Sequence, residues 1–500
     1  MDQGLVIPED TRDATKWGLS PRQLGRIQGL VVSGFGHLPV TRALFLKLDR
    51  PGGGWLKALE KVAPITPATG RLNRSTAIAF TCAGLKRLGL SDTADIPAFA
   101  LPFQEGMHQP DRRRRLGDEE KNGTVIPGGP LWSGDPAATP QTVHALLLLY
   151  AADEADLADW CAQVMATLEP MGVSLVRYLD LSLRMDPDGR AREHFGFADG
   201  FSQPVPYLAA ADSTAPGGGH AARDPWHGVP MGEVLMSYTN AHDEAAPAPV
   251  VQRPADVAAK HPDLKPGDAP EGFLDLGADG SYLVVRELRQ DVAAFWNSLD
   301  AAAQALGCPG IDADWLADRI VGREHDGDLL CPAGVHAAVG GQPANDVGFF
   351  REDFHGLGCP LGSHVRRANP RDGLAATEAD RSALLDAANN HRILRRGRKY
   401  GETIANRLED DGKERGLFFM CLNTDIVRQF EFIQQTWLLN RNFAGLYGET
   451  DPLLGPKGPF TIPKDPLRLK VEVETYVKMV GGDYFFLPSL PALKFMADLA

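Results

Sequence analysis

Apolar and polar residues alternate along short stretches of the first 180 residues, which is the pattern of half-buried β-strands. Between these stretches, apolar residues recur every three or four positions, as they do in amphipathic helices. We predict strands over 37–49, 75–80, 143–150 and 173–179, and helices over 55–62, 83–90 and 154–168. Strand–helix–strand, a loop-like connection over 98–140 and a second strand–helix–strand make a split βαβ, ferredoxin-like unit.

The same order of elements recurs in the second half of the chain. We predict strands over 280–288, 416–422 and 472–480, helices over 292–306, 312–321 and 425–439, a turn over 481–488 and a short final helix. No residue-level repeat relates the two halves, so only the order of elements repeats. The chain is therefore predicted to be an α+β protein of two ferredoxin-like halves, arranged like a dimeric α+β barrel.

The composition changes between these two halves. Residues 207–271 are dense in Ala, Pro, Gly and Asp, which indicates a long insertion that is partly mobile or acts as a lid. We therefore predict an N-terminal half over 1–190, a loop and insertion over 191–275, and a C-terminal half over 276–500.

Charge and composition exclude several classes of partner. The 500 residues carry a net charge of −14, which repels nucleic-acid phosphates and anionic membranes. Arg112–Arg115 form the only strong basic cluster, and the acids that follow it suggest a solvated loop. No apolar run approaches the ~20 residues that span a bilayer, and no signal pattern opens the chain. Six scattered cysteines without a CxxC pair indicate neither a zinc ribbon nor a disulfide framework. We expect a cytoplasmic protein with no nucleic-acid and no membrane partner.

Three polar residues stand out because apolar or glycine residues surround them. Asp199 lies in EHFGFADGFSQP (193–204), His364 in CPLGSHVRRANPR (359–371) and Arg395 in HRILRRGRKYG (391–401). Each has an ordinary structural explanation when taken alone: an Asp-Gly turn, a hydrogen-bonded structural histidine, and a cation at a helix end. A carboxylate among aromatic residues is nevertheless costly without a partner or a task, so the three together are the candidate site.

These segments resemble the motifs of the dye-decolourising peroxidases. GFADG is similar to the family's GxxDG motif, CPLGSHVRRANPR to its proximal-histidine segment, and HRILRRGRKYG to its distal-arginine segment. Residues 416–437 and 480–493 are similar to its C-terminal core, so the resemblance covers roughly 140–500 well and the first third more loosely. The length and the RRGRKYG ending resemble the longer, cytoplasmic bacterial branch.

The resemblance implies a haem peroxidase that uses hydrogen peroxide to oxidise dyes, phenolics or similar small aromatic reductants through a ferryl–porphyrin radical. One heme b (iron protoporphyrin IX) per chain would lie in the C-terminal half on His364, without covalent attachment because CxxCH is absent; His391 and His355 are the alternative ligands. Asp199 would move the proton of the peroxide, and Arg395 would stabilise the leaving oxygen. Alternatives are an iron-releasing haem-handling protein, a haem-binding peroxide sensor and a haem-free scaffold.

Further residues are given roles around these three. Asp425 is predicted to accept a hydrogen bond from His364, with an N-cap as its alternative role. Arg366 and Arg367 are predicted to contact the haem propionates, with a solvent-facing ion pair as the alternative. An unperturbed Asp pKa of about 3.9 predicts that Asp199 stays ionised in acid, which gives dye oxidation an acidic optimum. The oligomeric state, manganese oxidation and a surface radical residue are left unassigned, with Trp226, Trp437 and Tyr484 as conceivable relays.

Overall fold

The computed structural model describes residues 17–69, 72–118, 142–183, 189–209, 226–264, 270–330 and 347–500, together with residues 132, 186, 212 and 345. The N-terminal half contains β1 (Val40–Leu48), α3 (Trp55–Val62), β2 (Arg74–Phe80), α4 (Cys82–Leu88), β3 (Ala145–Ala151), α7 (Glu154–Leu168) and β4 (Val173–Ser182). The predicted order of elements is thus confirmed, and α3 and α7 have the predicted bounds. The strands pair antiparallel in the order β4-β1-β3-β2, as in a ferredoxin-like unit.

The C-terminal half repeats this order around the candidate site. Its main elements are β9 (Ser281–Gln290), α9 (Val292–Leu306), α10 (Ala313–Val321), β10 (Leu394–Arg395), β11 (Arg398–Tyr400), β12 (Gly416–Asn423), the π-helical segments η7 (Val427–Glu431) and η8 (Ile433–Leu438), β15 (Val477–Leu487) and α14 (Leu490–Ala497). Between α10 and β10 lie α11 (Phe349–Glu352), α12 (His364–Ala368) and α13 (Arg381–Asn389). The predicted helix over 425–439 is confirmed, but as a π-helix, a rare form that is frequent at functional sites.

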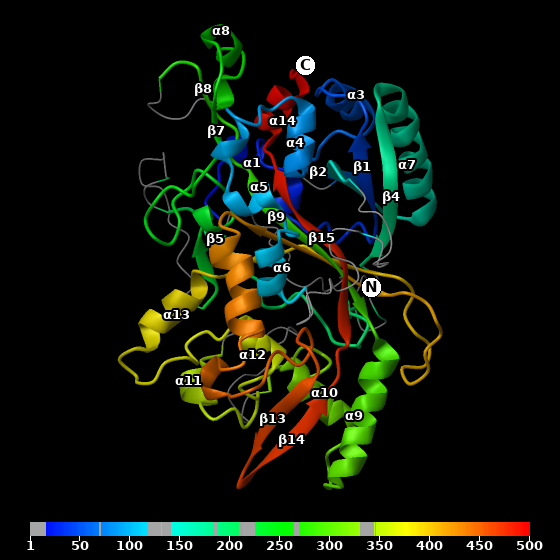
Figure 1. Ribbon diagram of the computed structural model, residues 1–500, viewed down its shortest axis with the longest axis vertical. Coiled ribbons are helices and arrows are strands. Elements are labelled where there is room, and N and C mark those ends of the chain that lie inside the picture. Colours follow the sequence, from blue (N-terminus) through cyan, green and yellow to red (C-terminus); the bar gives the residue numbers. More distant parts are fainter. Residues whose placement is uncertain are drawn as a thin grey trace, which may run out of the picture.

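Shorter elements connect these parts. They are α1 (Pro21–Leu24), α2 (Gly29–Val32), η1 (Ile96–Ala98), α5 (Leu101–Glu105), α6 (Pro110–Leu116), η3 (Glu169–Met171), β5 (Val205–Tyr207), β6 (Gly228–Pro230), η5 (Met231–Glu233), β7 (Val250–Gln252), α8 (Ala255–Ala258), η6 (Pro262–Leu264), β8 (Phe273–Asp275), η9 (Phe443–Gly445), and the hairpin β13 (Gly458–Lys464) and β14 (Leu467–Val473). Figure 1 shows α3, α4, α7 and α14 at one end of the molecule, and α9, α10, α11 and α12 at the other.

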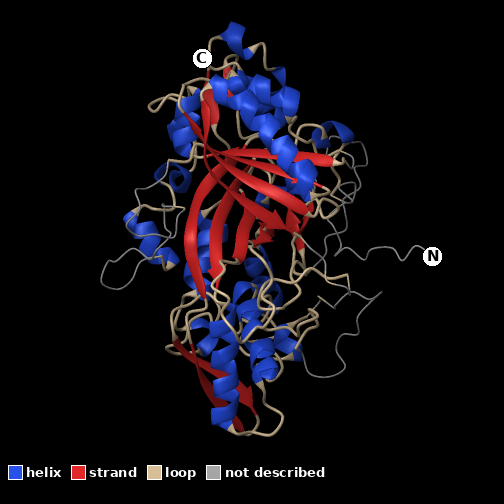
Figure 2. Ribbon diagram, turned by 90° about the vertical axis from the view of Figure 1, so that its right-hand side faces the viewer, coloured by secondary structure: helices blue, strands red, loops and turns tan. Residues whose placement is uncertain are grey.

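The two half-sheets join at their edges and close into one barrel. β11 pairs with β4, β15 pairs with β2, and β12 pairs with β9, so the nine-stranded sheet closes on itself. Figure 2 shows these strands side by side in the middle of the molecule. Because side chains alternate along a strand, one set fills the barrel, including Ala43, Phe45, Ala77, Leu146, Leu148, Val285, Phe418 and Phe485. The predicted α+β fold of two ferredoxin-like halves is confirmed, while the boundaries at 190 and 275 remain predictions.

The turn predicted over 481–488 is wrong, and the strand predicted over 472–480 is confirmed only in part, because residues 474–476 separate two strands there. β14 ends at Val473, and β15 runs through the expected turn, with a bulge between Met479 and Gly481. The two glycines serve packing instead: a Cβ on Gly481 would lie 2.6 Å from the Trp132 ring, and one on Gly482 would lie 2.5 Å from the Met479 methyl. Glycine inside a strand here marks the close approach of neighbouring groups.

The basic cluster Arg112–Arg115 is not a solvated loop. It forms most of α6, and Arg112 is buried, donating hydrogen bonds to Glu105 and Glu431 at 2.7 and 2.5 Å. Glu431 also accepts a hydrogen bond of 2.6 Å from the hydroxyl of Tyr484, which is buried as well. The first arginine of the cluster therefore belongs to the core and connects α6 to η7.

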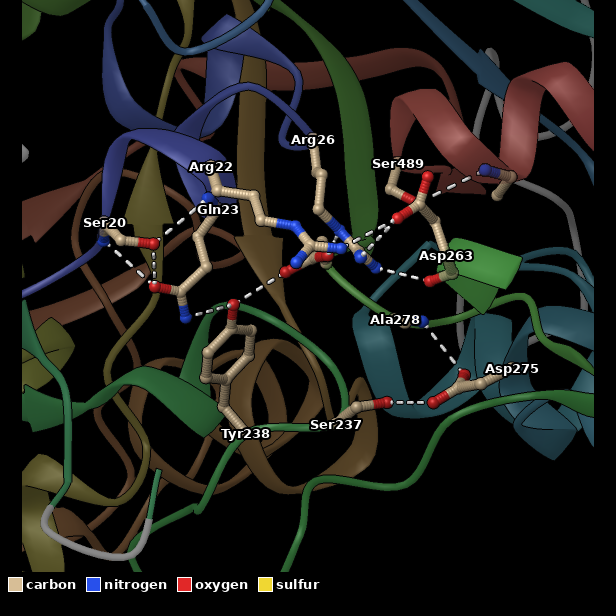
Figure 3. A network of polar contacts seen from close by, with 12 residues as sticks. Ser20, Arg22, Gln23, Arg26, Ser237, Tyr238, Asp263, Asp275, Ala278 and Ser489 are labelled. Atoms are coloured by element: carbon tan, nitrogen blue, oxygen red, sulfur yellow. Dashed lines mark hydrogen bonds and ion pairs between the residues drawn. The ribbon is translucent and has the colours of Figure 1, made fainter. Parts of the chain in front are cut away.

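The described part of the predicted insertion, residues 226–264, is anchored to the N-terminal segment. Arg26 Nε and the Tyr238 hydroxyl each donate to a different oxygen of Asp279 at 2.6 Å. Gln23 on α1 donates to the same hydroxyl at 3.2 Å (Figure 3). No residue of 226–264 lines the cavity described below, so this part of the chain is no lid over it. Residues 213–225 and 265–269 lie outside the described residues.

Candidate active site

A cavity of about 1050 Å³ lies against the outer face of the barrel in its C-terminal half. The sheet supplies Leu288, Gln290, Leu417, Phe419 and Val477 to its wall, and α12, η7 and η8 supply His364, Val365, Phe430, Ile433 and Leu438. Alternation along a strand explains the division, because Val285 and Phe418 fill the barrel while Leu288 and Leu417 face the cavity. A largely apolar space with a few convergent polar groups is typical of a ligand site.

Arg395 and Asp199, which are 196 residues apart in sequence, meet in this cavity. Leu394 of β10 points into the barrel, so its neighbour Arg395 points out into the cavity. Arg395 Nη1 donates to Asp199 Oδ1 at 3.0 Å, and the backbone N–H of Arg395 donates to Gln203 Oε1 at 3.0 Å. The structure thus brings together the two residues that the sequence analysis predicted to act as a pair.

Two glycines and a half-buried glutamate shape the loop that carries Asp199. Gly196 and Gly200 have φ values of 104° and 96°, which glycine adopts readily and other residues rarely. Glu193 accepts two backbone N–H groups of the loop, both at 2.9 Å, and one hydrogen bond of 2.5 Å from Gln290 on β9. Glu193 was missed by the sequence analysis, although an acid that opens an otherwise apolar segment was a possible signal.

The Asp199 carboxyl is held in its ionised form. Its side chain is 51% exposed because it faces the open cavity. Burial within the surrounding protein raises the pKa of Asp199, but the Arg395 guanidinium and the Gly200 N–H, which donates to Oδ1 at 2.6 Å, together bring it below the ordinary value. A base with a low pKa remains deprotonated in acid, and the arginine beside it remains charged.

His364 opens α12 and is held from behind by a buried carboxylate. Its Nδ1 lies 2.9 Å from Oδ2 of Asp451, whose side chain is fully buried. The carboxylate accepts a hydrogen bond from the Nδ1–H group, so the proton stays on Nδ1 and the lone pair of Nε2 is free to bind a metal. Burial lowers the pKa of His364, but the Asp451 charge and hydrogen bond raise it by more.

The prediction that Asp425 is the partner of His364 is wrong. Asp425 instead caps the helix that follows it, because its Oδ1 accepts the backbone N–H of Arg428 at 2.9 Å. Asp451 was missed because it is 87 residues from His364 in the sequence and lies in an irregular loop. Its one sequence signal is a carboxylate placed directly before Pro-Leu-Leu, where it is costly without a partner.

The prediction that Arg366 and Arg367 contact haem propionates is not supported, because both are buried and neither lines the cavity. Arg366 Nη1 donates to the carbonyls of Asp353 and Cys359, both at 2.9 Å. Arg367 donates to the Trp437 carbonyl at 2.8 Å. It also donates to the carbonyls of Gly362, Asn440 and Glu449 at 3.0–3.1 Å. These guanidinium groups fasten α12 to its surroundings. The solvent-facing alternative is wrong for the same reason.

The residues of the cavity fit an iron porphyrin. No described residue bonds Nε2 of His364, so this atom can face an iron. The amide oxygen of Asn369 is buried in the cavity wall without a partner among the described residues, which a ligand would remedy. Arg323 and Arg392 line the same cavity and provide positive charge for carboxylates. His391 and His355 do not line it, and His391 instead contacts the Arg428 carbonyl at 2.5 Å.

Two other expectations concern metals and surface aromatics. Among the described residues, no three His, Cys, Asp or Glu side chains gather as a metal site, so none is assigned to manganese.

The aromatic residues considered as electron relays are Trp226, Trp437 and Tyr484. Trp437 and Tyr484 are buried, so neither presents its ring to a bulky reductant in solvent. No helix within the described ranges is long and apolar enough to cross a membrane.

The cavity brings together a histidine backed by a buried carboxylate and an arginine–aspartate pair, which is the arrangement of a peroxidase site. The chain belongs to the dye-decolourising peroxidase family. It is 32% identical over 393 residues to the multifunctional dye peroxidase DyP2 of Amycolatopsis, a match that covers 72% of this chain and 74% of that protein. The chain is therefore a peroxidase, and members of this family are haem enzymes. No family model matches the chain.

More distant relatives and solved structures agree with this assignment. The chain is 26% identical over 499 residues to a dye-decolourising peroxidase of Auricularia auricula-judae, covering 93% of this chain and 85% of that protein. The crystal structure of a DyP-type peroxidase from Anabaena superimposes with a TM-score of 0.72 at 24% identity, covering 99% and 98% of the two chains. The structure of Amycolatopsis DyP2 superimposes with a TM-score of 0.70 at 25% identity, covering 96% and 98%.

Proposed function

We propose that the chain binds one heme b through His364 and uses hydrogen peroxide to oxidise dyes and small phenolic reductants. The observation that carries this proposal is the 3.0 Å contact between Arg395 and Asp199 in the cavity that also holds His364 and its partner Asp451. A solved structure with a TM-score of 0.69 is described as a dye-decolourising peroxidase in complex with 2,6-dimethoxyphenol, which suggests the class of reductant.

The cavity residues divide the chemistry between them. Haem, held by His364, would supply the redox chemistry: it would store the two oxidising equivalents of the peroxide until two reductant molecules each donate one electron. Asp199, ionised, takes a proton from one peroxide oxygen and delivers it to the other, which then leaves as water. Arg395 stabilises the negative charge that develops on the leaving oxygen. Asp451 keeps the Nδ1 proton of His364 in place, which makes the imidazole a stronger electron donor.

The haem carboxylates need partners other than Arg366 and Arg367. Arg323 and Arg392 line the cavity, and both adjoin the end of the Asp199 loop: the Arg323 guanidinium lies 5.9 Å from the Phe201 ring, and Arg392 donates to the Ser202 carbonyl at 3.2 Å. We assign the propionate contacts to this end of the cavity, together with Asn369. The cytoplasmic location is a prediction from the sequence.

Absorption spectroscopy with a dye assay tests the proposal. The purified protein should show a Soret band, lose it in His364→Ala, and keep it in Asp425→Ala, which alters a carboxylate outside the site. Peroxide-dependent bleaching of an anthraquinone dye should disappear in Arg395→Leu although haem is retained. A protein without haem after reconstitution would contradict the proposal. Haem binding without bleaching would favour a peroxide sensor, and peroxide-independent release of iron would favour haem handling.

A further inference from the structure

Among the described strands, β10 pairs with β12 alone, so the backbone of Arg395 has no described strand neighbour on its other side. β10 is only two residues long. Arg395 lies opposite Cys421, and the next residue, Arg396, donates its backbone N–H to the Met420 carbonyl of β12 at 2.8 Å. Neighbouring residues of a strand point their backbone groups to opposite sides. The N–H and C=O of Arg395 therefore point away from β12, where an edge strand has no partner.

Two side chains replace the missing strand. Gln203 Oε1 accepts the Arg395 N–H at 3.0 Å, and Arg396 Nη1 donates to the Arg395 carbonyl at 3.1 Å. Arg396 is itself fixed, because its Nε and Nη2 donate to the carbonyls of Leu30 and Val31 at 2.9 and 2.7 Å. Both backbone polar groups of Arg395 are thus satisfied by side chains, one from the distant Gln203 and one from the adjacent Arg396.

We propose that Gln203 is a positioning residue for Arg395: its side-chain oxygen fixes the Arg395 backbone and so sets where the guanidinium meets Asp199 and the peroxide. Gln203 does not line the cavity, so it acts only through Arg395. Asp199 and Gln203 belong to one loop, which holds Arg395 twice, by its guanidinium at 3.0 Å and by its backbone N–H at 3.0 Å. The inference rests on the proposed function for its catalytic consequence, but not for the contact itself.

Because the loop holds Arg395 by both its backbone and its guanidinium, a shift of the Arg395 backbone also changes the interaction of its guanidinium with the Asp199 carboxylate. A displacement of about 1 Å in a catalytic group costs on the order of a hundredfold in rate. A guanidinium that moves away from Asp199 also ceases to offset the effect of burial on that carboxyl. Loss of the Gln203 acceptor should therefore slow the peroxide reaction and move its acid limit to higher pH, a combined change that a general loss of stability does not produce.

The test uses three variants. Gln203→Leu removes the acceptor oxygen, and Gln203→Glu keeps one. Gln304→Leu, on the exposed face of α9, is the control for the change from Gln to Leu. Hydrogen–deuterium exchange of the peptide that contains Arg395 is measured on the full-length protein, with and without haem. Gln203→Leu should exchange faster at this peptide, and Gln203→Glu and Gln304→Leu should match the parent. Unchanged exchange in Gln203→Leu would overturn the proposal. If Gln203→Leu does not fold, Gln203→Met carries the same comparison.

Rapid mixing of the haem-loaded variants with peroxide gives the second readout. Gln203→Leu should react on the order of tenfold to a hundredfold more slowly than the parent, with its acid limit at higher pH, and Gln203→Glu should recover most of the rate. Faster exchange together with an unchanged rate and pH profile would also overturn the positioning role. Failure of haem binding in the parent would refute the proposed function while leaving the exchange test intact.

Discussion

Asp451 holds His364 by one oxygen and its own loop by the other. Oδ2 lies 2.9 Å from Nδ1 of His364, while Oδ1 accepts the backbone N–H groups of Leu453 and Leu454 at 2.9 and 2.8 Å. Burial raises the pKa of Asp451, but His364 and these N–H groups lower it by more. The carboxylate therefore stays charged, and it has no freedom to turn away from the imidazole.

Replacing Asp451 should weaken the iron ligand without removing it. In Asp451→Asn the side chain keeps its size but loses its charge, so His364 becomes a poorer donor. We expect a higher reduction potential and a peroxide reaction slower by about 10–100-fold. Redox titration and rapid mixing measure the two effects. Asp425→Asn is the matched control, because Asp425 does not line the cavity and an asparagine oxygen can still accept the Arg428 N–H. A reduction potential and a rate in Asp451→Asn equal to those of the parent would contradict the role given to Asp451.

The pH dependence of the peroxide reaction should follow Asp199. The base works while it is ionised, so activity is present above its pKa and is lost as pH falls through it. Because Arg395 holds the pKa of Asp199 below the ordinary value, the rate constant should stay flat down to pH about 4. Oxidation of anionic dyes should peak in acid, where repulsion from the −14 surface is weaker. A rate that halves between pH 7 and 6 would contradict this assignment.

Removing the guanidinium should change the pH profile as well as the rate. In Arg395→Leu, burial still raises the pKa of Asp199, but the opposing cation is gone. The acid limit of the residual peroxide reaction should therefore move to higher pH than in the parent. Arg395→Lys keeps a positive charge but not the planar guanidinium with its two parallel donors. Its acid limit should therefore lie near that of the parent, while its rate should stay lower than that of the parent. An identical acid limit in all three proteins would show that the two residues are not coupled.

Arg367 should matter for folding rather than for haem contact. Its guanidinium donates to five backbone carbonyls, the longest bond being 3.5 Å to Leu438, and Arg367→Met removes the donor from all of them. We expect the free energy of unfolding of the haem-free protein to fall by at least about 3 kcal/mol in denaturant titrations. Arg351→Met, which removes an exposed ion pair with Glu378, should change it little. A loss of stability seen only in the haem-loaded protein would contradict this role and would indicate that Arg367 contacts the haem.

Local sequence patterns predicted the elements whose causes are local. The apolar periodicity of Glu154–Leu168 and Val292–Leu306 gave both helices their observed bounds, because each buries one face: α7 against the barrel sheet, and α9 against α10 and the β13–β14 hairpin. The glycines 481 and 482 misled the prediction of β15, since their reason is packing against Trp132 and Met479 from elsewhere in the chain. Sequence alone does not reveal such a neighbour.

In the candidate site, too, the sequence revealed residues in recognisable local segments but not contacts between distant residues. Asp199, His364 and Arg395 were found because each lies in a recognisable segment, and the structure places all three in one cavity. Asp451 and Gln203 were not found, because each acts on a residue 87 or 192 positions away through a contact that only folding creates. Arg366 and Arg367 were misassigned since charge near a ligand histidine suggests ligand contact, whereas burial commits these groups to backbone carbonyls.

The most direct test of the account is the rate at which one equivalent of hydrogen peroxide changes the visible spectrum of the haem-loaded protein, in the parent and in Asp199→Asn. The account predicts equal Soret bands before mixing, since Asp199 does not bind iron, and a rate in Asp199→Asn lower by about 10²–10⁴-fold. Equal rates in the two proteins would contradict the role of Asp199 as the base. A parent protein that holds haem on His364 but does not react with peroxide would contradict the site as a whole.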